Sequence, residues 1–196
     1  MALATGSARN LSVLLPLLAA APAAAQDPTR LPSAVTLFGG RMINDEFHEV
    51  LPFDDVSWRR SNLIGLAASR RLWEIGQFAD IEVEGQVVRH FGNQHHWEFN
   101  ALGVGRWRLF PWSETVHTTL AYGLGLSYAT ELPNDEVAHR GSSKRTLFYW
   151  VAELEVGPPD APWSAIARLH HRSTGFGLLG DNGGSNALVA GLRWRF

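Results

Sequence analysis

A histidine and a serine lie two residues apart late in the chain, within the segment Ala167-Arg168-Leu169-His170-His171-Arg172-Ser173-Thr174. Small and apolar residues alternate there with basic ones, which predicts a β-strand. Residues two apart in a strand project from the same face, so His171 and Ser173 share the face of Ala167 and Leu169. A serine becomes a good nucleophile when a base takes its proton and a third group orients that base. The two residues are therefore a candidate nucleophile and general base.

The N-terminal part of the chain has the features of a targeting segment. Arg9 supplies a positive charge, an apolar stretch runs from Leu11 to Ala21, and Ala23-Ala24-Ala25 forms a small-residue cleavage site. The apolar stretch is too short to span a bilayer well, which disfavours the alternative of a membrane anchor. We expect a cleaved signal peptide over residues 1–25 and an exported mature domain over residues 26–196.

The composition suits a β-rich membrane protein. Hydrophobic residues make up 45% of the 196 residues and there are 19 glycines, which is rich for a soluble domain of this size. A formal net charge of −2 gives no basic footprint for nucleic acid. The absence of cysteine excludes disulfides and thiolate metal sites. No apolar run in the mature chain reaches the roughly 20 residues of a spanning helix, so entry into a membrane would require a closed β-barrel.

Eight segments of alternating apolar and polar residues follow the predicted signal peptide. One of the clearest sets Ile81, Val83 and Val87 on one face against acidic residues on the other. Longer polar loops alternate with short turns between the segments, as in outer-membrane barrels. These features predict an all-β fold, an eight-stranded antiparallel outer-membrane β-barrel. The expected strands cover about 34–43, 61–72, 78–91, 97–109, 115–129, 144–156, 163–176 and 186–196.

The apolar faces of these strands are expected to meet lipid, and the polar faces to line the interior. Eight strands leave an interior that side chains fill, so neither a pore nor a row of catalytic carboxylates is expected. Interior charges should pair, because isolated buried charges are too costly. A soluble lipocalin-like barrel, the alternative fold, would need the reverse arrangement. The expected interior charges are Asp80, Glu82, Glu84, Glu98, Glu153 and Glu155 with Arg106, Arg108, Arg168, Arg172, Arg193 and Arg195.

His171 and Ser173 lie on the apolar face of their strand, so we expect them to face lipid near the outer leaflet. With a signal peptide, eight strands, a His-x-Ser sequence in the seventh strand and a terminal aromatic at Phe196, the chain resembles the lipid A 3-O-deacylases, the PagL-like outer-membrane enzymes. The resemblance implies that Ser173 is the nucleophile and His171 the base of a lipid-facing hydrolase. It also implies a lipid A or lipopolysaccharide substrate, a location in the bacterial outer membrane, no cofactor and a homodimer as one oligomeric state.

The third member of the triad is where the chain departs from the family. Counted back from the last residue, the family's glutamate falls at Asn186, which shares a face with Leu188 and Trp194. Asparagine can accept a hydrogen bond from the histidine and hold its tautomer, but it cannot stabilise an imidazolium by charge. Ser185 is expected to point into the barrel, and Asp181 is the nearest alternative acid.

The residue after the nucleophile is Thr174, where the family tends to have asparagine. The backbone N–H groups of Thr174 and Gly175 are candidate oxyanion donors. A glycine at this point would let the backbone approach an ester carbonyl closely.

Other interpretations stay open at this point. His171 and Ser173 could be interfacial polar residues on a catalytically inactive barrel with a structural or adhesive role, and a soluble lipid-binding barrel is the further alternative. His90, His95 and His96 match no metal-site spacing and are interpreted as interfacial or loop residues.

Overall fold

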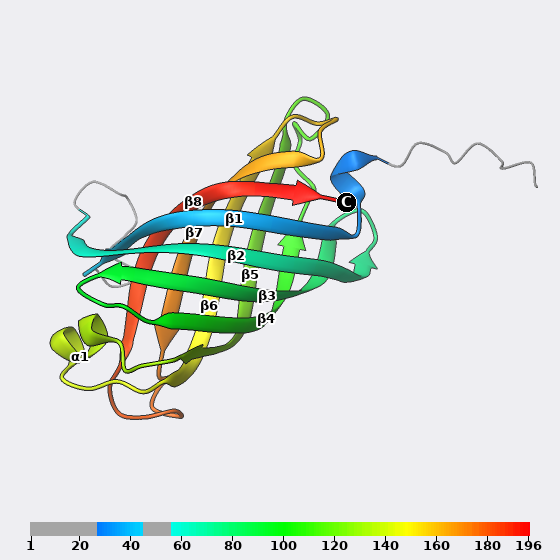
Figure 1. Ribbon diagram of the computed structural model, residues 1–196. Helices are drawn as coiled ribbons and strands as arrows, with labels where there is room; N and C mark the ends of the chain where they lie inside the picture. The colour runs from blue at the N-terminus through cyan, green and yellow to red at the C-terminus, as the bar shows by residue number, and fades with distance from the viewer. Residues whose placement is uncertain (1–26, 45–55) are drawn as a thin grey trace, which may run out of the picture.

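Eight antiparallel strands pair in chain order, and the first pairs back onto the last, so the sheet closes into a barrel (Figure 1). The computed structural model describes residues 27–44 and 56–196, and the predicted signal peptide lies outside them. The predicted eight-stranded antiparallel barrel is confirmed. Among the described residues, no helix is long and apolar enough to cross a membrane. The elements are η1 (Pro28–Arg30), β1 (Ser33–Ile43), β2 (Trp58–Ile75), β3 (Ala79–Gly92), β4 (Trp97–Trp107), β5 (His117–Ala129), α1 (Asn134–Arg140), β6 (Thr146–Gly157), β7 (Trp163–Ser173) and β8 (Gly184–Arg195).

Most strand ends lie close to the predicted ones, and the differences have local causes. β2 extends past both ends of the predicted segment. β7 stops at Ser173 rather than near Phe176, because Gly175, Phe176 and Gly177 have φ angles of +64°, +58° and +90° and leave the extended region. The candidate serine is therefore the last residue of its strand.

The loop between β5 and β6, expected to be polar and irregular, contains the short helix α1. The helix ends at Gly141, whose φ of +79° suits a glycine cap. Figure 1 shows α1 and the β7–β8 turn at one end of the barrel, and η1 and the C-terminus at the other. Asp135 and Glu136 of this surface helix are nevertheless buried, so α1 presents acidic groups to the rest of the protein.

Exposed and buried residues alternate along the strands, most regularly in β4. The exposed positions carry large apolar side chains, such as Leu66 and Leu124, which are 55% and 54% exposed. The buried positions carry most of the charges. This arrangement is the reverse of a soluble barrel and suits an exterior that faces lipid.

Tryptophans mark both ends of the exposed apolar face. Trp107, Trp163 and Trp194 lie near the short turns, and Trp58 and Trp97 begin strands at the α1 end. Aromatic girdles of this kind flank the apolar band of outer-membrane barrels, whose short turns face the periplasm. By that rule the α1 end is the outer end.

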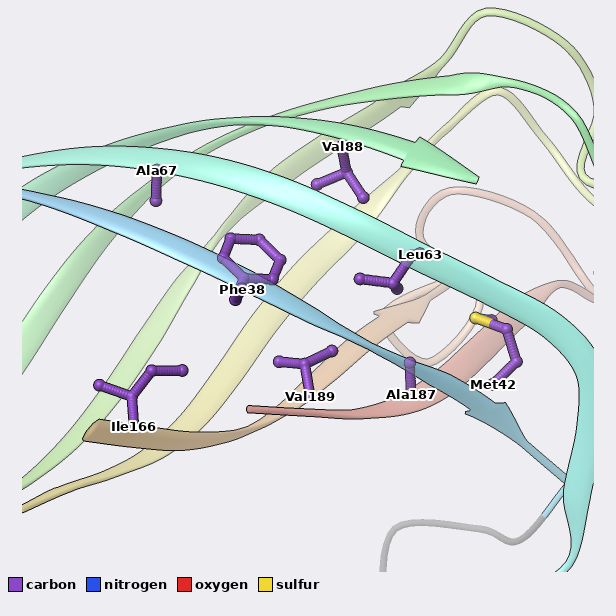
Figure 2. Packing of buried hydrophobic residues seen from close by; sticks show 8 residues of the cluster. All are labelled: Phe38, Met42, Leu63, Ala67, Val88, Ile166, Ala187 and Val189. Atoms are coloured by element: carbon purple, nitrogen blue, oxygen red, sulfur yellow. The ribbon is translucent and has the colours of Figure 1, made fainter. Parts of the chain in front are cut away.

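A small apolar cluster fills part of the interior between β1, β2, β3, β7 and β8 (Figure 2). Phe38 has room there because residue 65 is glycine: a Cβ at Gly65 would lie 2.3 Å from the Phe38 ring. On its other side, the guanidinium carbon of Arg168 lies 5.4 Å from the centre of the Phe38 ring. The cluster therefore adjoins the charged part of the interior.

Ion pairs between strands fill much of the remaining interior. The Arg106 guanidinium lies 3.0 Å from a carboxylate oxygen of Glu82 and 2.9 Å from oxygens of Glu153 and Glu155. Arg168 lies 2.6 Å from Glu153, so this one carboxylate serves two arginines. The expected interior pairing is confirmed for these residues.

One of the expected interior arginines lies at the rim. Arg108 follows the last residue of β4 and is partly exposed, although its Nε lies 3.0 Å from the buried carboxylate of Asp80. The fourth strand was expected to reach residue 109 and ends two residues earlier, which leaves Arg108 at the mouth of the barrel.

Replacing Glu153 by alanine tests the importance of this pairing. Glu153→Ala leaves Arg106 and Arg168 short of a carboxylate and should lower the free energy of unfolding by about 3–5 kcal/mol. The measurement is equilibrium urea unfolding of the barrel in lipid vesicles. Glu74→Ala is the matched control, because Glu74 pairs with Arg30 at the exposed rim and such pairs contribute about 0–1 kcal/mol. Equal effects of the two substitutions would contradict the proposed importance of the interior network.

Candidate active site

His171 and Ser173 lie on the outer face of β7, close to its outer end. Along this strand the inward residues Arg168, His170 and Arg172 are buried, whereas His171 and Ser173 are partly exposed. The alternation of a single strand thus sends neighbouring residues to the two sides of the barrel wall.

The pairing of β7 with β8 sets His171 directly opposite Asn186. His171 Nδ1 lies 2.5 Å from the side-chain oxygen of Asn186. Because an amide oxygen only accepts, Nδ1 carries the proton and donates it. The lone pair is then on His171 Nε2, as a general base requires. Asn186 is only 5% exposed, which shields this hydrogen bond.

An aromatic ring holds His171 from the other neighbouring strand. Trp150 of β6 pairs with His171, and the two ring centres lie 4.6 Å apart at an interplanar angle of 37°. Asn186 and Trp150 together restrict the rotation of the imidazole. Among the hydrogen bonds of residues 27–44 and 56–196, none joins Ser173 to His171.

Two backbone donors of the turn that follows β7 have no hydrogen-bond partner among the described residues. A Cβ at residue 175 would lie 2.2 Å from the Phe148 ring, and its φ is +64°, so both space and backbone favour glycine. The N–H groups of Leu179 and Leu178 donate to the carbonyls of Thr174 and Gly175, at 3.0 and 3.3 Å. None of the hydrogen bonds of this turn uses the N–H groups of Thr174 or Gly175.

The two alternatives for the third group lie elsewhere. Ser185 points into the barrel, as its parity predicts, and its hydroxyl donates to Glu136 at 2.8 Å. Asp181 is exposed and lines a surface hollow with Lys144 and Arg145. The orienting partner of His171 in this structure is Asn186.

Helix α1 fastens the two strands of the site from inside the barrel. Glu136 Oε1 accepts hydrogen bonds from Arg172 Nη1 and Ser185 Oγ, both at 2.8 Å. Arg172 and Ser185 face one another across β7 and β8, between the His171–Asn186 pair and the end of β7. Glu136 therefore holds together the strand segments that carry the candidate site. No sequence pattern predicts this contact, because it depends on how the β5–β6 loop folds over the end of the barrel.

An open groove runs along the outer face next to the site. It has a volume of about 600 Å³ and lies over β1, β2 and β8. The small residues Gly39 and Ala190 pair with each other at the bottom of the groove. Leu188, which lies two residues after Asn186 on the same face of β8, also lines the groove. Arg41 and Trp58 line the groove as well, so an apolar channel ends beside a positive charge.

The histidines of the β3–β4 region occupy two environments. The interpretation as loop or interfacial residues holds for His95, which is exposed. It is wrong for His90, which lies within β3 and is 2% exposed among buried polar groups. His96 does lie in the loop between β3 and β4, but its side chain is also only 2% exposed and stacks on His90. Residues 90, 96 and 98 are all even-numbered, like the inward-facing residues of β3 and β4, and this alternation could have predicted that both histidines are buried.

The closed sheet of eight strands, with apolar side chains outside and charged side chains inside, defines a barrel of the outer-membrane type. The crystal structure of the outer membrane enzyme PagL has the same fold: it matches with a TM-score of 0.58 over 83% of this chain and 99% of that chain. The sequence identity is 11%, so this likeness shows the fold alone. No family model and no curated protein matches the chain.

Removing the Glu136 carboxylate tests whether α1 fastens the site. In Glu136→Ala, Arg172 and Ser185 lose a shared acceptor. Hydrogen bonds to charged groups contribute about 1.5–3 kcal/mol, so backbone amides at the outer ends of β7 and β8 should exchange with deuterium roughly 10- to 100-fold faster. Glu131→Ala, at an exposed position of the same loop, is the control. Exchange that matches the control would show that α1 does not hold these strands.

Proposed function

We propose that this chain is an outer-membrane serine esterase that removes a 3-O-linked hydroxyacyl chain from lipid A of lipopolysaccharide. The observation that carries the proposal is the His171–Asn186 hydrogen bond beside Ser173 on the apolar exterior of a PagL-like barrel. A cleaved signal peptide over residues 1–25 would export the protein. The outer end of β7 would then meet the outer leaflet, where lipid A resides.

In the first half-reaction, Ser173 Oγ attacks the carbonyl carbon of the 3-O ester, and His171 Nε2 takes the hydroxyl proton. The charge that develops on the carbonyl oxygen would be met by the N–H groups of Thr174 and Gly175. The tetrahedral intermediate then collapses. The sugar 3-oxygen leaves with the proton from His171, and the acyl group stays on Ser173.

In the second half-reaction, water attacks the acyl-serine ester. His171 Nε2 accepts a proton from the water and returns it to Ser173 Oγ as the acyl chain departs as a carboxylic acid. Throughout, Asn186 holds the Nδ1–H proton with a neutral oxygen. It fixes the tautomer without adding a charge that would stabilise the imidazolium, which predicts a slower enzyme than one with a carboxylate at this position.

The surroundings of the site suit a lipid substrate. The apolar groove beside Asn186 could take an acyl chain, and Arg41 at its edge could meet a phosphate of the head group. The substrate would reach Ser173 sideways from the leaflet, because the charged side chains of the barrel interior block a route through the lumen.

The alternative is a catalytically inactive outer-membrane barrel. The lack of a hydrogen bond between Ser173 and His171 in this structure favours it. Against this, the serine is the last residue of its strand, and catalytic hydrogen bonds often tighten only when substrate binds.

Expression of the chain in a Gram-negative host whose lipid A keeps its 3-O-acyl chain separates the two functions. Mass spectra of the lipid A should lose the mass of one hydroxyacyl group, and Ser173→Ala or His171→Ala should lower the rate at least about 10³-fold. Ser142→Ala, an exposed loop serine, should act like the unmodified chain. An unchanged spectrum from correctly inserted protein would rule out the deacylase, and activity in Ser173→Ala would rule out this nucleophile.

Substitutions at Asn186 test the role of the neutral partner. Asn186→Asp keeps the shape and the hydrogen bond and adds a charge, so the rate on purified lipopolysaccharide in detergent should rise about tenfold, or about 1.4 kcal/mol. Asn186→Ala frees the tautomer and should lower the rate by about 10²-fold or more. An Asn186→Ala rate equal to that of the unmodified chain would show that Asn186 does not orient the base.

A further inference from the structure

The densest group of ligand-type side chains outside the candidate active site lies inside the barrel. His90 on β3, Glu98 on β4 and His170 on β7 all project inward and are 2%, 0% and 1% exposed. His90 Nε2 lies 2.9 Å from Glu98 Oε2, and His170 Nε2 lies 2.9 Å from Glu98 Oε1. One ligand atom from each residue lies within 4.8 Å of the other two. Three strands therefore converge on one small volume.

The protons around His170 can be placed from its neighbours. The Gln86 side-chain nitrogen donates to Glu84 at 2.7 Å, so the Gln86 oxygen faces the Tyr149 hydroxyl, 3.0 Å away. Two oxygens at this distance share a hydrogen, and the tyrosine is the one that has it. Its oxygen then accepts from His170 Nδ1–H at 2.8 Å. In neutral His170, Nε2 carries a lone pair that points at Glu98.

A similar arrangement surrounds His90. Its Nδ1 lies 3.1 Å from the Gln94 side-chain nitrogen, which can only donate, while the Gln94 oxygen is buried without a hydrogen-bond partner in the described structure. Turning this amide about its last bond brings the oxygen onto Nδ1–H and leaves the lone pair on Nε2, again facing Glu98. Two lone pairs and a carboxylate that converge repel one another unless protons or a cation lie between them.

We propose that His90, Glu98 and His170 bind a divalent transition-metal ion, for which Zn²⁺ is the best-matched probe. Two imidazole nitrogens and one carboxylate form a common three-ligand set for zinc, with water in the fourth position. Zinc bonds of about 2.0–2.1 Å place tetrahedral ligand atoms roughly 3.3 Å apart. The two present 2.9 Å separations involve different oxygens of Glu98, and the ligand atoms of the three residues lie within 4.8 Å of one another. On binding, the two imidazoles would close toward one carboxylate oxygen, or the carboxylate would bind through both oxygens.

The neighbouring groups suit such a centre. Metal-binding histidines usually donate their other N–H to an oxygen, which fixes the tautomer. The Tyr149 oxygen stands at that position for His170, and the Gln94 oxygen does so for His90 once its amide is turned. The His96 ring stacks on His90 with centres 4.3 Å apart, and its buried Nε2 has no hydrogen-bond partner among the described residues. A metal-bound water could satisfy this nitrogen.

The proposed ion would brace three strands at the outer half of the barrel. His170 is the inward neighbour of His171, so the metal centre would lie directly behind the candidate base. Binding of this ion does not depend on the proposed esterase. Chain spacing alone could not show the site, because His90 and Glu98 lie on the adjacent strands β3 and β4 while His170 comes from the distant strand β7.

The test uses the full mature chain without a polyhistidine tag, folded in detergent micelles, with Zn²⁺ and Co²⁺ as probes. After loading with Zn²⁺ and dialysis, elemental analysis should find about one ion per folded chain. Co²⁺ should give the visible absorption bands of a four- or five-coordinate site, and Zn²⁺ should raise the melting temperature. These three measurements use the unmodified chain, so they do not depend on a variant that folds.

Variants then assign the ligands. The double variant His90→Gln, His170→Gln should bind less than about a tenth of an equivalent and lose the Co²⁺ bands, while heat-modifiable gel mobility confirms that it is folded. His95→Gln, from the exposed neighbouring histidine, should bind like the unmodified chain. Ser173→Ala should also keep full binding, which separates this site from the esterase.

The proposal is overturned if the folded, unmodified chain retains less than about a tenth of an equivalent of Zn²⁺ and shows no Co²⁺ bands. It is equally overturned if His95→Gln loses as much metal as the double variant. In the first case the His–Glu–His group holds protons alone, and in the second the ion sits at the surface.

Discussion

The charged side chains buried inside this barrel need partners of opposite charge, and those partners lie on other strands. This requirement favours the one register of the paired strands that brings the charges together. An unpaired buried ion costs several kcal/mol. Arg106 reaches Glu82 across to β3 and Glu153 across to β6, and Arg168 links β7 to both Glu84 and Glu153. A slip of one residue in any of these strands would turn its charges toward lipid and its apolar side chains inward. The closed sheet, the alternation of its side chains and the apolar exterior are therefore one solution to the same constraint.

That constraint also determines where chemistry on a lipid can take place. Because ion pairs and the Phe38 cluster fill the interior, a lipid substrate is left with the outer wall. On β7, His170 and Arg172 point inward and belong to the interior network. His171 and Ser173 alternate with them and point outward. The interior contacts of Glu136 with Arg172 support the outer pair from behind. A single strand thus joins the packing of the core to the candidate site.

Much of this could be predicted from the sequence where the signal is local. Period-two alternation predicted the strands and their inward and outward faces. The resemblance to the lipid A 3-O-deacylases, aligned by a count from the last residue, implied that Asn186 lies by His171, and the two side chains are hydrogen-bonded. The catalytic roles of these residues stay predictions. The contacts that could not be predicted are long-range. Glu136 enters the barrel from a short helix with little pattern of its own, and Glu98 joins His90 and His170 across three strands. The end of β7 was predicted three residues too late, because Gly175, Phe176 and Gly177 have positive φ angles. The two glycines hint at this in the sequence, but the positive φ of Phe176 could not be predicted.

Covalent labelling shows directly whether Ser173 is a nucleophile activated by His171 on the lipid-facing wall. The folded chain in detergent micelles is treated with a long-chain alkyl fluorophosphonate, which reacts with activated serines, and its peptides are analysed by mass spectrometry. An adduct is expected on Ser173 in the unmodified chain and none in His171→Ala. No adduct on folded protein, or an adduct on another serine that is independent of His171, would contradict it.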